Sequence, residues 1–158
     1  KGEKILKVVG SFYEKFSKDL NLMVSFNQFK KIYCNIFKLN DKIAKLIMEL
    51  RKSYRLILLS NTDELHFRYL KNRFKIIKIF NDYVLSYEIG CKKPNPLIFL
   101  NALRKAKALP LNCVYFDDIP EFVYVARFMG IRAFLYKSHK KLINDLKNVK
   151  ILSNVVIR

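Results

Sequence analysis

Three short stretches of the sequence bring together residue types that bind ions. In the first, Leu56-Ile-Leu-Leu-Ser-Asn-Thr62, an apolar run ends in hydroxyl and amide side chains. The second, Gly90-Cys-Lys-Lys-Pro-Asn-Pro96, sets Lys93 in a proline-rich turn, and the third, Val114-Tyr-Phe-Asp-Asp118, ends in adjacent carboxylates. Hydroxyl, N–H and ammonium groups donate hydrogen bonds to anions, and Mg²⁺ prefers carboxylate oxygens. Together the stretches contain the groups needed to hold a phosphate and a Mg²⁺ ion.

Taken singly, each stretch also has a plainer interpretation. Ser60 and Asn61 could form an ordinary turn after a strand, and Lys93 before its proline could lie in a surface turn. Asp117 and Asp118 would repel each other if both were buried and unpaired. A Mg²⁺ ion would relieve that repulsion, whereas the alternative is a pair of residues that caps a helix N-terminus.

The elements that must position these residues follow from apolar periodicity. Strands are expected at the apolar runs Arg55–Leu59, Tyr83–Leu85, Cys113–Phe116 and Ile131–Tyr136. Helices are expected from Asp41, over Glu64–Arg73, from Pro96, from Pro120 to a cap at Gly130, and over Lys140–Leu146. Residues Val155–Ile157 are either an edge strand or a frayed end. This alternation predicts an α/β fold with a Rossmann-like parallel sheet wrapped by helices.

The first forty residues lack this alternation. Ser25 and Gln28 form a capping-box pattern before apolar residues at helical spacing, so amphipathic helices are expected here. We predict a helical cap segment over residues 1–40 and an α/β core over residues 41–158.

Composition narrows the class of protein. A chain of 158 residues that is 51% hydrophobic fits one folded domain. No apolar run approaches the ~18 residues of a membrane span, and three cysteines without Cys-x-x-Cys spacing favour free thiols in a reducing cytoplasm. The net charge of +18 is spread along the chain, so nucleic acid is not an expected partner. The sequence begins with Lys1 and not with Met, which suggests a processed, cloned or truncated N-terminus.

The side chain of His66 is expected to pack or to form hydrogen bonds, and not to act as a base.

In this order, and with the helical segment before them, the three stretches resemble the haloacid dehalogenase-like (HAD) hydrolase superfamily. The likeness is strongest to the branch of glucose-1-phosphatase-like enzymes and the phosphatase domain of soluble epoxide hydrolases. It lies in Leu58–Phe67, Leu85–Pro94 and Val114–Glu121, followed by Ala126 and Gly130. The resemblance implies a Mg²⁺-dependent phosphatase that acts on a small phosphorylated metabolite through an aspartyl-phosphate.

The resemblance also implies roles for individual residues. The resemblance implies that phosphate is bound by Ser60, Asn61, Thr62 and Lys93. Lys93 would in addition steady the nucleophile, and Asp118, supported by Asp117, would ligate Mg²⁺. Lys93 Nζ is expected within ~6–8 Å of the Asp118 carboxylate, with a small anion and a metal between them.

The sequence departs from the family pattern in two places. Phe122 stands where the family often has Asn or Asp near the metal, and a Phe cannot assist a cation, so Glu121 either takes that role or the role is lost. No Asp-x-Asp occurs in the chain, although the first Asp of that motif is the family's nucleophile. We therefore expect a fragment that is inactive alone. The alternative is a non-catalytic remnant that binds phosphate, Mg²⁺ or a partner chain.

The strand that carries the missing motif is expected at the centre of the sheet, between the strands that end at Ser60 and Asp117. If that place were empty, backbone groups of both flanking strands would lack hydrogen-bond partners. Three outcomes are open: the flanking strands pair directly, Ile5–Val9 or Val155–Ile157 fills the place, or the chain alone folds poorly and aggregates through its open edges.

Overall fold

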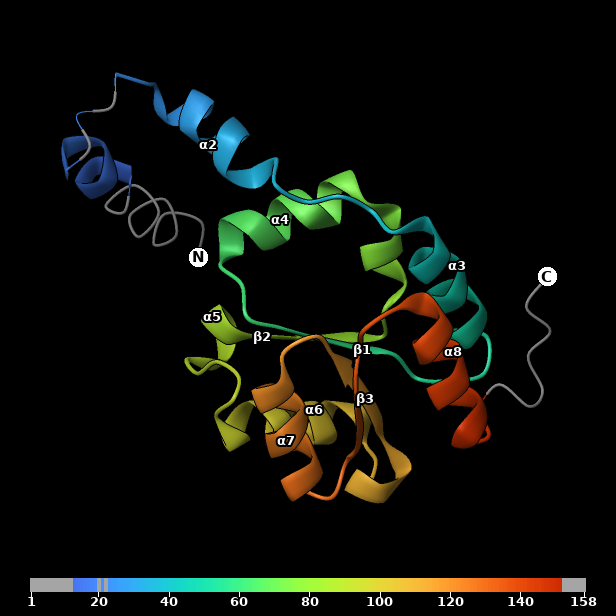
Figure 1. Cartoon of the computed structure of the whole chain (residues 1–158). Helices are drawn as coiled ribbons and strands as arrows, with labels where there is room; N and C mark the ends of the chain where they lie inside the picture. The colour runs from blue at the N-terminus through green and yellow to red at the C-terminus, as the bar shows by residue number, and fades with distance from the viewer. Residues whose placement is uncertain (1–12, 20, 22, 152–158) are drawn as a thin grey trace.

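The computed structural model describes residues 13–19, 21 and 23–151, and shows an α/β fold (Figure 1). Its strands are β1 (Ile57–Ser60), β2 (Asp82–Leu85), β3 (Val114–Asp117) and β4 (Arg132–Leu135). Each lies within two residues of the run that predicts it. The α-helices that follow a helical stretch at residues 13–19 are α2 (Phe26–Cys34), α3 (Asp41–Leu50), α4 (Glu64–Arg73), α5 (Ser86–Ile89), α6 (Pro96–Ala106), α7 (Pro120–Phe128) and α8 (His139–Asn148). The predicted fold class is confirmed.

The helix boundaries follow from capping residues in the sequence. The Ser25 side chain accepts a hydrogen bond from the Gln28 N–H, and the Gln28 side-chain oxygen accepts one from the Ser25 N–H, so the predicted capping box forms. Asn40 caps α3 through the Ile43 N–H. Gly130 follows α7 with a φ of +82°, a conformation that glycine adopts without strain.

Some short elements were not predicted. These are α5 and two 3₁₀ segments, η1 (Lys75–Ile79) and η2 (Pro110–Asn112). Each is five residues or fewer, too short for a period of 3.6 residues to appear in the apolar pattern. The last helix is also longer than expected: Ser138 caps it through the Lys141 N–H, so it starts at His139, and it continues past Leu146 to Asn148.

The parallel strands form two separate pairs. In the first, Ile57 lies opposite Asp82 and Ser60 opposite Leu85; in the second, Val114 lies opposite Arg132. Within the described residues β1 pairs with β2 alone and β3 with β4 alone. Direct pairing of β1 with β3, one of the expected outcomes, is therefore not found. Ile5–Val9 and Val155–Ile157 lie outside the described residues.

A cavity of about 390 Å³ is lined by residues of β1 and of β3, the two strands that do not pair with each other. Ile57 and Leu59 of β1 contribute one part of its wall, and Val114, Tyr115 and Phe116 of β3 another. Apolar side chains of α6 line it as well, namely Phe99, Ala102, Leu103 and Ala106. We call this space the central cavity. It is the place where the missing strand was expected.

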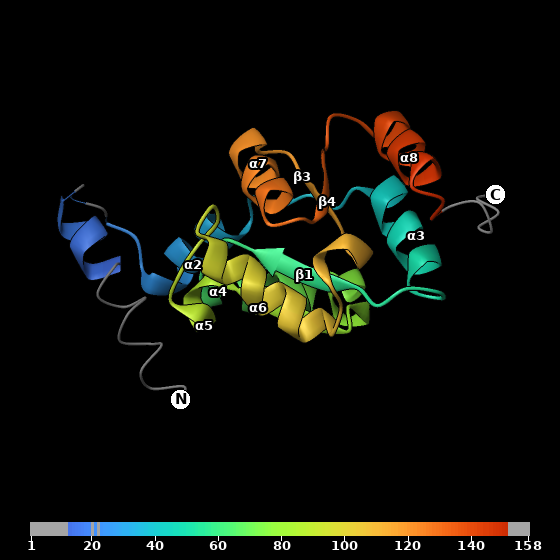
Figure 2. The same cartoon turned by 90° about the horizontal axis from the view of Figure 1, so that it is seen from below.

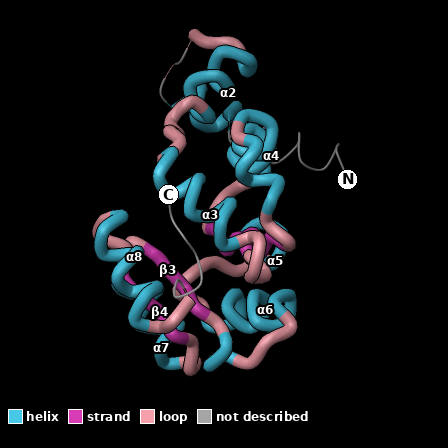
Figure 3. Tube along the Cα trace, turned by 90° about the vertical axis from the view of Figure 1, so that its right-hand side faces the viewer, coloured by secondary structure: helices cyan, strands magenta, loops and turns pink. Residues whose placement is uncertain are grey.

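Helices cover the strands on either side. Buried side chains of α6 and α7, including Phe99 and Val123, pack with Val84 and Ala133 in the main hydrophobic cluster. A second cluster joins Leu46 of α3 to two leucines of α8, so these helices lie side by side (Figure 2). Helix α2 lies at one end of the molecule, against α4 and away from α7 (Figure 3). None of the helices in the described ranges has the length and apolar character of a membrane span.

Candidate active site

A buried ion pair between Lys93 and Asp117 lies at the centre of the candidate site. Lys93 Nζ is 2.6 Å from Asp117 Oδ2, and both side chains are less than a tenth exposed. The same ammonium donates to the carbonyl oxygen of Leu59 at 3.3 Å. Leu59 belongs to β1 and Asp117 ends β3. One lysine therefore spans the carboxyl ends of two strands that do not pair with each other, the edge where α/β folds bind their ligands.

Two further donors fix the Asp117 carboxylate. The Tyr115 hydroxyl donates to Oδ2 at 2.5 Å, and the Ile119 N–H donates to Oδ1 at 3.0 Å. Burial alone would raise the pKa of Asp117, but hydrogen bonds from Lys93, Tyr115 and the Ile119 N–H together hold that pKa below its usual value. Burial and the Asp117 carboxylate raise the pKa of Tyr115, which keeps its proton. Asp117 is thus held ionised as the acceptor for its neighbours.

Aromatic rings surround the lysine ammonium. Lys93 Nζ lies 5.0 Å from the centre of the Phe122 ring and 5.8 Å from the centre of the Tyr115 ring. Such distances allow a favourable cation–π interaction. The expectation that Phe122 cannot assist a cation is therefore wrong for this ammonium, although a phenyl ring still offers no oxygen to a metal. Residue type alone could not reveal the contact, since it depends on α7 packing over the lysine.

Asn61 positions Lys93 through its main chain. The Asn61 side-chain oxygen accepts from the Lys93 N–H at 2.7 Å, and its amide nitrogen donates to the Lys93 carbonyl at 3.0 Å. Both ends of the side-chain amide are therefore engaged. The Asn61 side-chain amide keeps a second N–H, so a donation from Asn61 to a phosphate could come from that group or from its backbone N–H.

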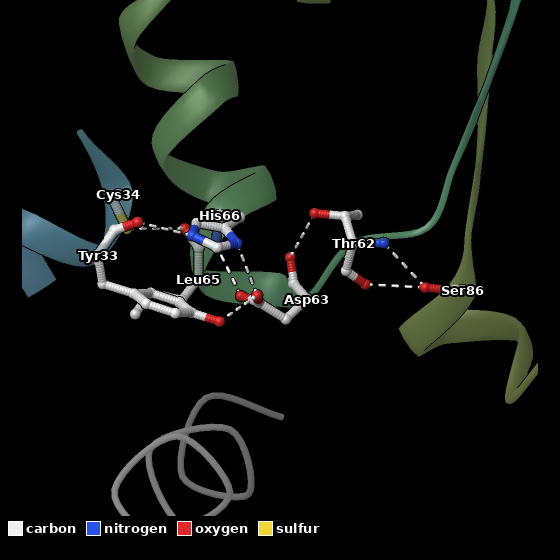
Figure 4. A network of polar contacts seen from close by, with 7 residues as sticks. All are labelled: Tyr33, Cys34, Thr62, Asp63, Leu65, His66 and Ser86. Carbon is white, nitrogen blue, oxygen red and sulfur yellow. Dashed lines mark hydrogen bonds and ion pairs between the residues drawn. The ribbon is translucent and has the colours of Figure 1, made fainter. Parts of the chain in front are cut away.

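The loop after β1 is also tied to β2 and α5. The Thr62 N–H donates to the Ser86 hydroxyl, which donates in turn to the Thr62 carbonyl, both at 2.9 Å (Figure 4). Sequence reasoning missed Ser86, although a hydroxyl residue directly after the Tyr83–Leu85 run was the available signal. Ser60 ends β1, is half-buried, and within the described residues its hydroxyl has no hydrogen-bond partner. Of the two hydroxyl residues among the predicted phosphate ligands, Ser60 is therefore the one with a free hydroxyl in the described residues, since Thr62 donates to the Asp63 carbonyl.

The carboxylates of Asp118 and Glu121 are exposed and make no hydrogen bond or ion pair in the described part of the chain. The direct partner of Lys93 is Asp117, and the expected spacing between Lys93 and Asp118 stays a prediction. Mg²⁺ is usually bound by one or two carboxylates together with water and phosphate oxygens. Residues 13–19, 21 and 23–151 contain no cluster of three or more potential metal-ligating side chains. A Mg²⁺ site at Asp118 therefore stays a prediction, and it would need ligands beyond the carboxylates of the described residues.

Comparison with known proteins places the chain in a family. A profile described as haloacid dehalogenase-like hydrolase matches residues 10–130, which is most of the chain. The chain belongs to this family of hydrolases, as the three stretches predict.

Solved structures agree with that assignment. A HAD family enzyme from Bacteroides thetaiotaomicron, crystallised with magnesium and inorganic phosphate, has 28% identity and a TM-score of 0.74 over 82% of this chain and 70% of that one. A predicted HAD-like family hydrolase from Porphyromonas gingivalis shares the fold, with 23% identity and a TM-score of 0.73 over 88% of this chain and 71% of that one.

A curated relative also matches part of the chain. The D-ribitol-5-phosphate phosphatase of Bacteroides thetaiotaomicron is 32% identical over 94 residues. The match covers 56% of this chain and 46% of that enzyme, so the chain corresponds to about half of this relative's length.

Proposed function

We propose that this chain forms part of a Mg²⁺-dependent phosphatase for a small phosphorylated metabolite. The observation that carries the proposal is the Lys93–Asp117 pair, which bridges the carboxyl ends of β1 and β3 beside the central cavity. The curated relative is a phosphatase of a polyol phosphate, and the related crystal structure holds magnesium and phosphate. A sugar or polyol phosphate is therefore the substrate class we expect.

In this proposal the central cavity is the place of a strand that ends in the nucleophilic Asp. An Asp at the carboxyl end of that strand would lie between Ser60 and Asp117, within reach of Lys93. The lysine ammonium would then be shared between the nucleophile and a phosphate oxygen. The helical segment before Asp41 would act as the cap that excludes water and contacts the rest of the substrate.

The other residues would bind the phosphoryl group and the metal. Ser60 would donate its hydroxyl to a phosphate oxygen, and the backbone N–H of Asn61 would add a second donor. Asp118 would hold Mg²⁺, with Glu121 or Asp117 supporting it, and the ion would neutralise charge on the phosphoryl oxygens. Asn61 and Ser86 would act indirectly, since they fix the positions of Lys93 and the loop after β1.

The proposed function can be tested by adding the strand and the nucleophilic Asp that the chain lacks. A strand that ends in Asp-x-Asp, with the first cap segment of a HAD family member, would be fused before Lys1. We expect the fusion to hydrolyse p-nitrophenyl phosphate in the presence of Mg²⁺, whereas the chain alone stays at background. Asp118→Asn should lower the rate on the order of 100-fold, a typical loss for one electrostatic contact in an active site. Glu121→Gln is the matched control and should have a smaller effect.

Two results would contradict the proposal. A folded fusion that binds phosphate without turnover would favour a non-catalytic remnant. Robust hydrolysis by the chain alone, abolished by Asp118→Ala, would show that a residue within it serves as the nucleophile.

A further inference from the structure

Helix α2 contacts the core through the imidazole of His66 in α4. The ring stacks on Tyr33 of α2 with centres 4.1 Å apart and planes 13° from parallel. Nδ1 lies 2.8 Å from Asp63 Oδ2, and Nε2 lies 2.8 Å from the carbonyl oxygen of Tyr33 (Figure 4). Phe37 meets the ring edge-on, and the side chain is only 13% exposed. The imidazole is thus enclosed between the cap helix and the core.

The two partners of this ring are both hydrogen-bond acceptors. A backbone carbonyl oxygen and an ionised carboxylate have no proton to donate. Neutral imidazole carries one N–H and can satisfy one of them, whereas the imidazolium carries two and can satisfy both. Both contacts can be hydrogen bonds at the same time only when His66 is charged.

Asp63 connects this ring to the loop after β1. Its carboxylate accepts from the Tyr33 hydroxyl at 3.0 Å and caps α4 through the His66 backbone N–H at 2.9 Å. Asp63 directly follows Thr62, which Ser86 holds from the other side. One carboxylate therefore joins the cap helix to the loop that we propose binds phosphate.

Other titratable groups face the same junction. Burial, then Asp63, raises the pKa of Tyr33 to about 12, and the same two causes raise the pKa of Cys34, which Lys30 opposes. The Cys34 thiol donates to the Leu65 carbonyl, and the Tyr69 hydroxyl donates to the Asn35 side chain. Tyrosine and shielded thiols keep their protons between pH 5 and 8, the range in which histidine changes charge.

We propose that His66 is a positioning residue whose charged form latches helix α2 onto Asp63 and the loop after β1. Loss of the ring charge removes one of its two ring hydrogen bonds, so the neutral ring holds the helix less firmly than the charged ring. The latch itself does not depend on the proposed function. Its consequence, that the cap is closed over the phosphate site more firmly at acidic pH, rests on that function.

Nitrogen NMR of the imidazole rings tests the protonation directly. The chain has two histidines, and His139→Gln removes the other one, leaving a single ring to observe. At pH 6 both ring nitrogens of His66 should have the chemical shifts of protonated nitrogen. A ring with one unprotonated nitrogen at pH 6 would overturn the proposal.

Hydrogen exchange tests the consequence for the helix. Protection factors of α2 amides, corrected for intrinsic exchange, should fall about tenfold between pH 6 and pH 8, the factor expected for one hydrogen bond to a charged group. In His66→Gln they should be lower and the same at both pH values. Amides of α6 report that each variant is folded. Asp63→Asn should reproduce the loss, because Asn still caps α4 but carries no charge.

An equal pH dependence of α2 protection in the original chain and in His66→Gln would overturn the latch. None of these measurements uses phosphatase activity. Failure of the completed site to hydrolyse phosphate would therefore leave their result unaffected.

Discussion

At the scale of single residues, Asp117 combines burial of a charged carboxylate with several hydrogen bonds. It accepts hydrogen bonds from Lys93, Tyr115 and a backbone N–H while remaining almost fully buried. Asp117→Asn would leave the Lys93 ammonium buried without an opposite charge. We expect a loss of about 3 kcal/mol in the free energy of unfolding, measured by urea denaturation. Asp118→Asn, one residue away and exposed, should stay within about 0.5 kcal/mol.

The same carboxylate predicts how stability depends on pH. The folded-state pKa of Asp117 is lowered, so its ionised form contributes stability above the unfolded-state value of about 3.9. That contribution is lost as the pH falls through the lower folded-state pKa. The stability difference between the original chain and Asp117→Asn should therefore be constant near neutrality and shrink below about pH 4. A difference that grew on acidification would contradict the Lys93–Asp117 assignment.

Some of the site could be predicted from residue types. Ser60 and the acidic pair stand directly after apolar runs and Lys93 stands in a proline-rich turn, and the structure brings Lys93 and Asp117 together at the ends of β1 and β3. The interactions that position them could not be predicted. The clamp of Asn61 on Lys93 joins residues 32 positions apart, and the Phe122 ring reaches the ammonium only because α7 packs there.

At the scale of elements, the turn after α7 depends on Gly130. Its φ of +82° is strained for residues with a Cβ, although an added Cβ would meet Pro110 at an ordinary 3.5 Å. Gly130→Ala should therefore cost about 1 kcal/mol through backbone strain and not through a clash. Thermal or urea unfolding would measure it. Gly130→Asn is the control, since Asn tolerates this conformation better, and a larger loss with Asn than with Ala would contradict the explanation.

Regular elements could be predicted because capping and periodicity are local signals. The boundaries of α4 agree with the predicted Glu64–Arg73, where Asp63 provides the cap. The α5 turn and the 3₁₀ segments could not be predicted, because their conformation is set by packing and not by a repeating apolar pattern. The division into a cap over residues 1–40 and a core over residues 41–158 stays a prediction.

At the scale of the whole molecule, the two pairs of strands and the central cavity are the main feature. A strand between β1 and β3 would fill a gap of about two strand spacings, roughly 10 Å. Each buried backbone group left unpaired at such an edge costs ~1–3 kcal/mol. A few of them approach the whole stability of a small domain, ~5–15 kcal/mol. We therefore expect the described fold to be marginal until a strand occupies the cavity.

Thermal unfolding of the chain with an added strand peptide tests this central claim. The peptide would be an apolar strand of about five residues that ends in Asp-x-Asp, and a copy with a central proline, which cannot pair on both sides, is the control. We predict that the first peptide raises the unfolding midpoint by at least about 3 °C, the shift expected for ~1 kcal/mol in a chain of this size, and that the proline copy does not. A sharp cooperative transition of the monomeric chain, at the same temperature with either peptide or with none, would contradict the account.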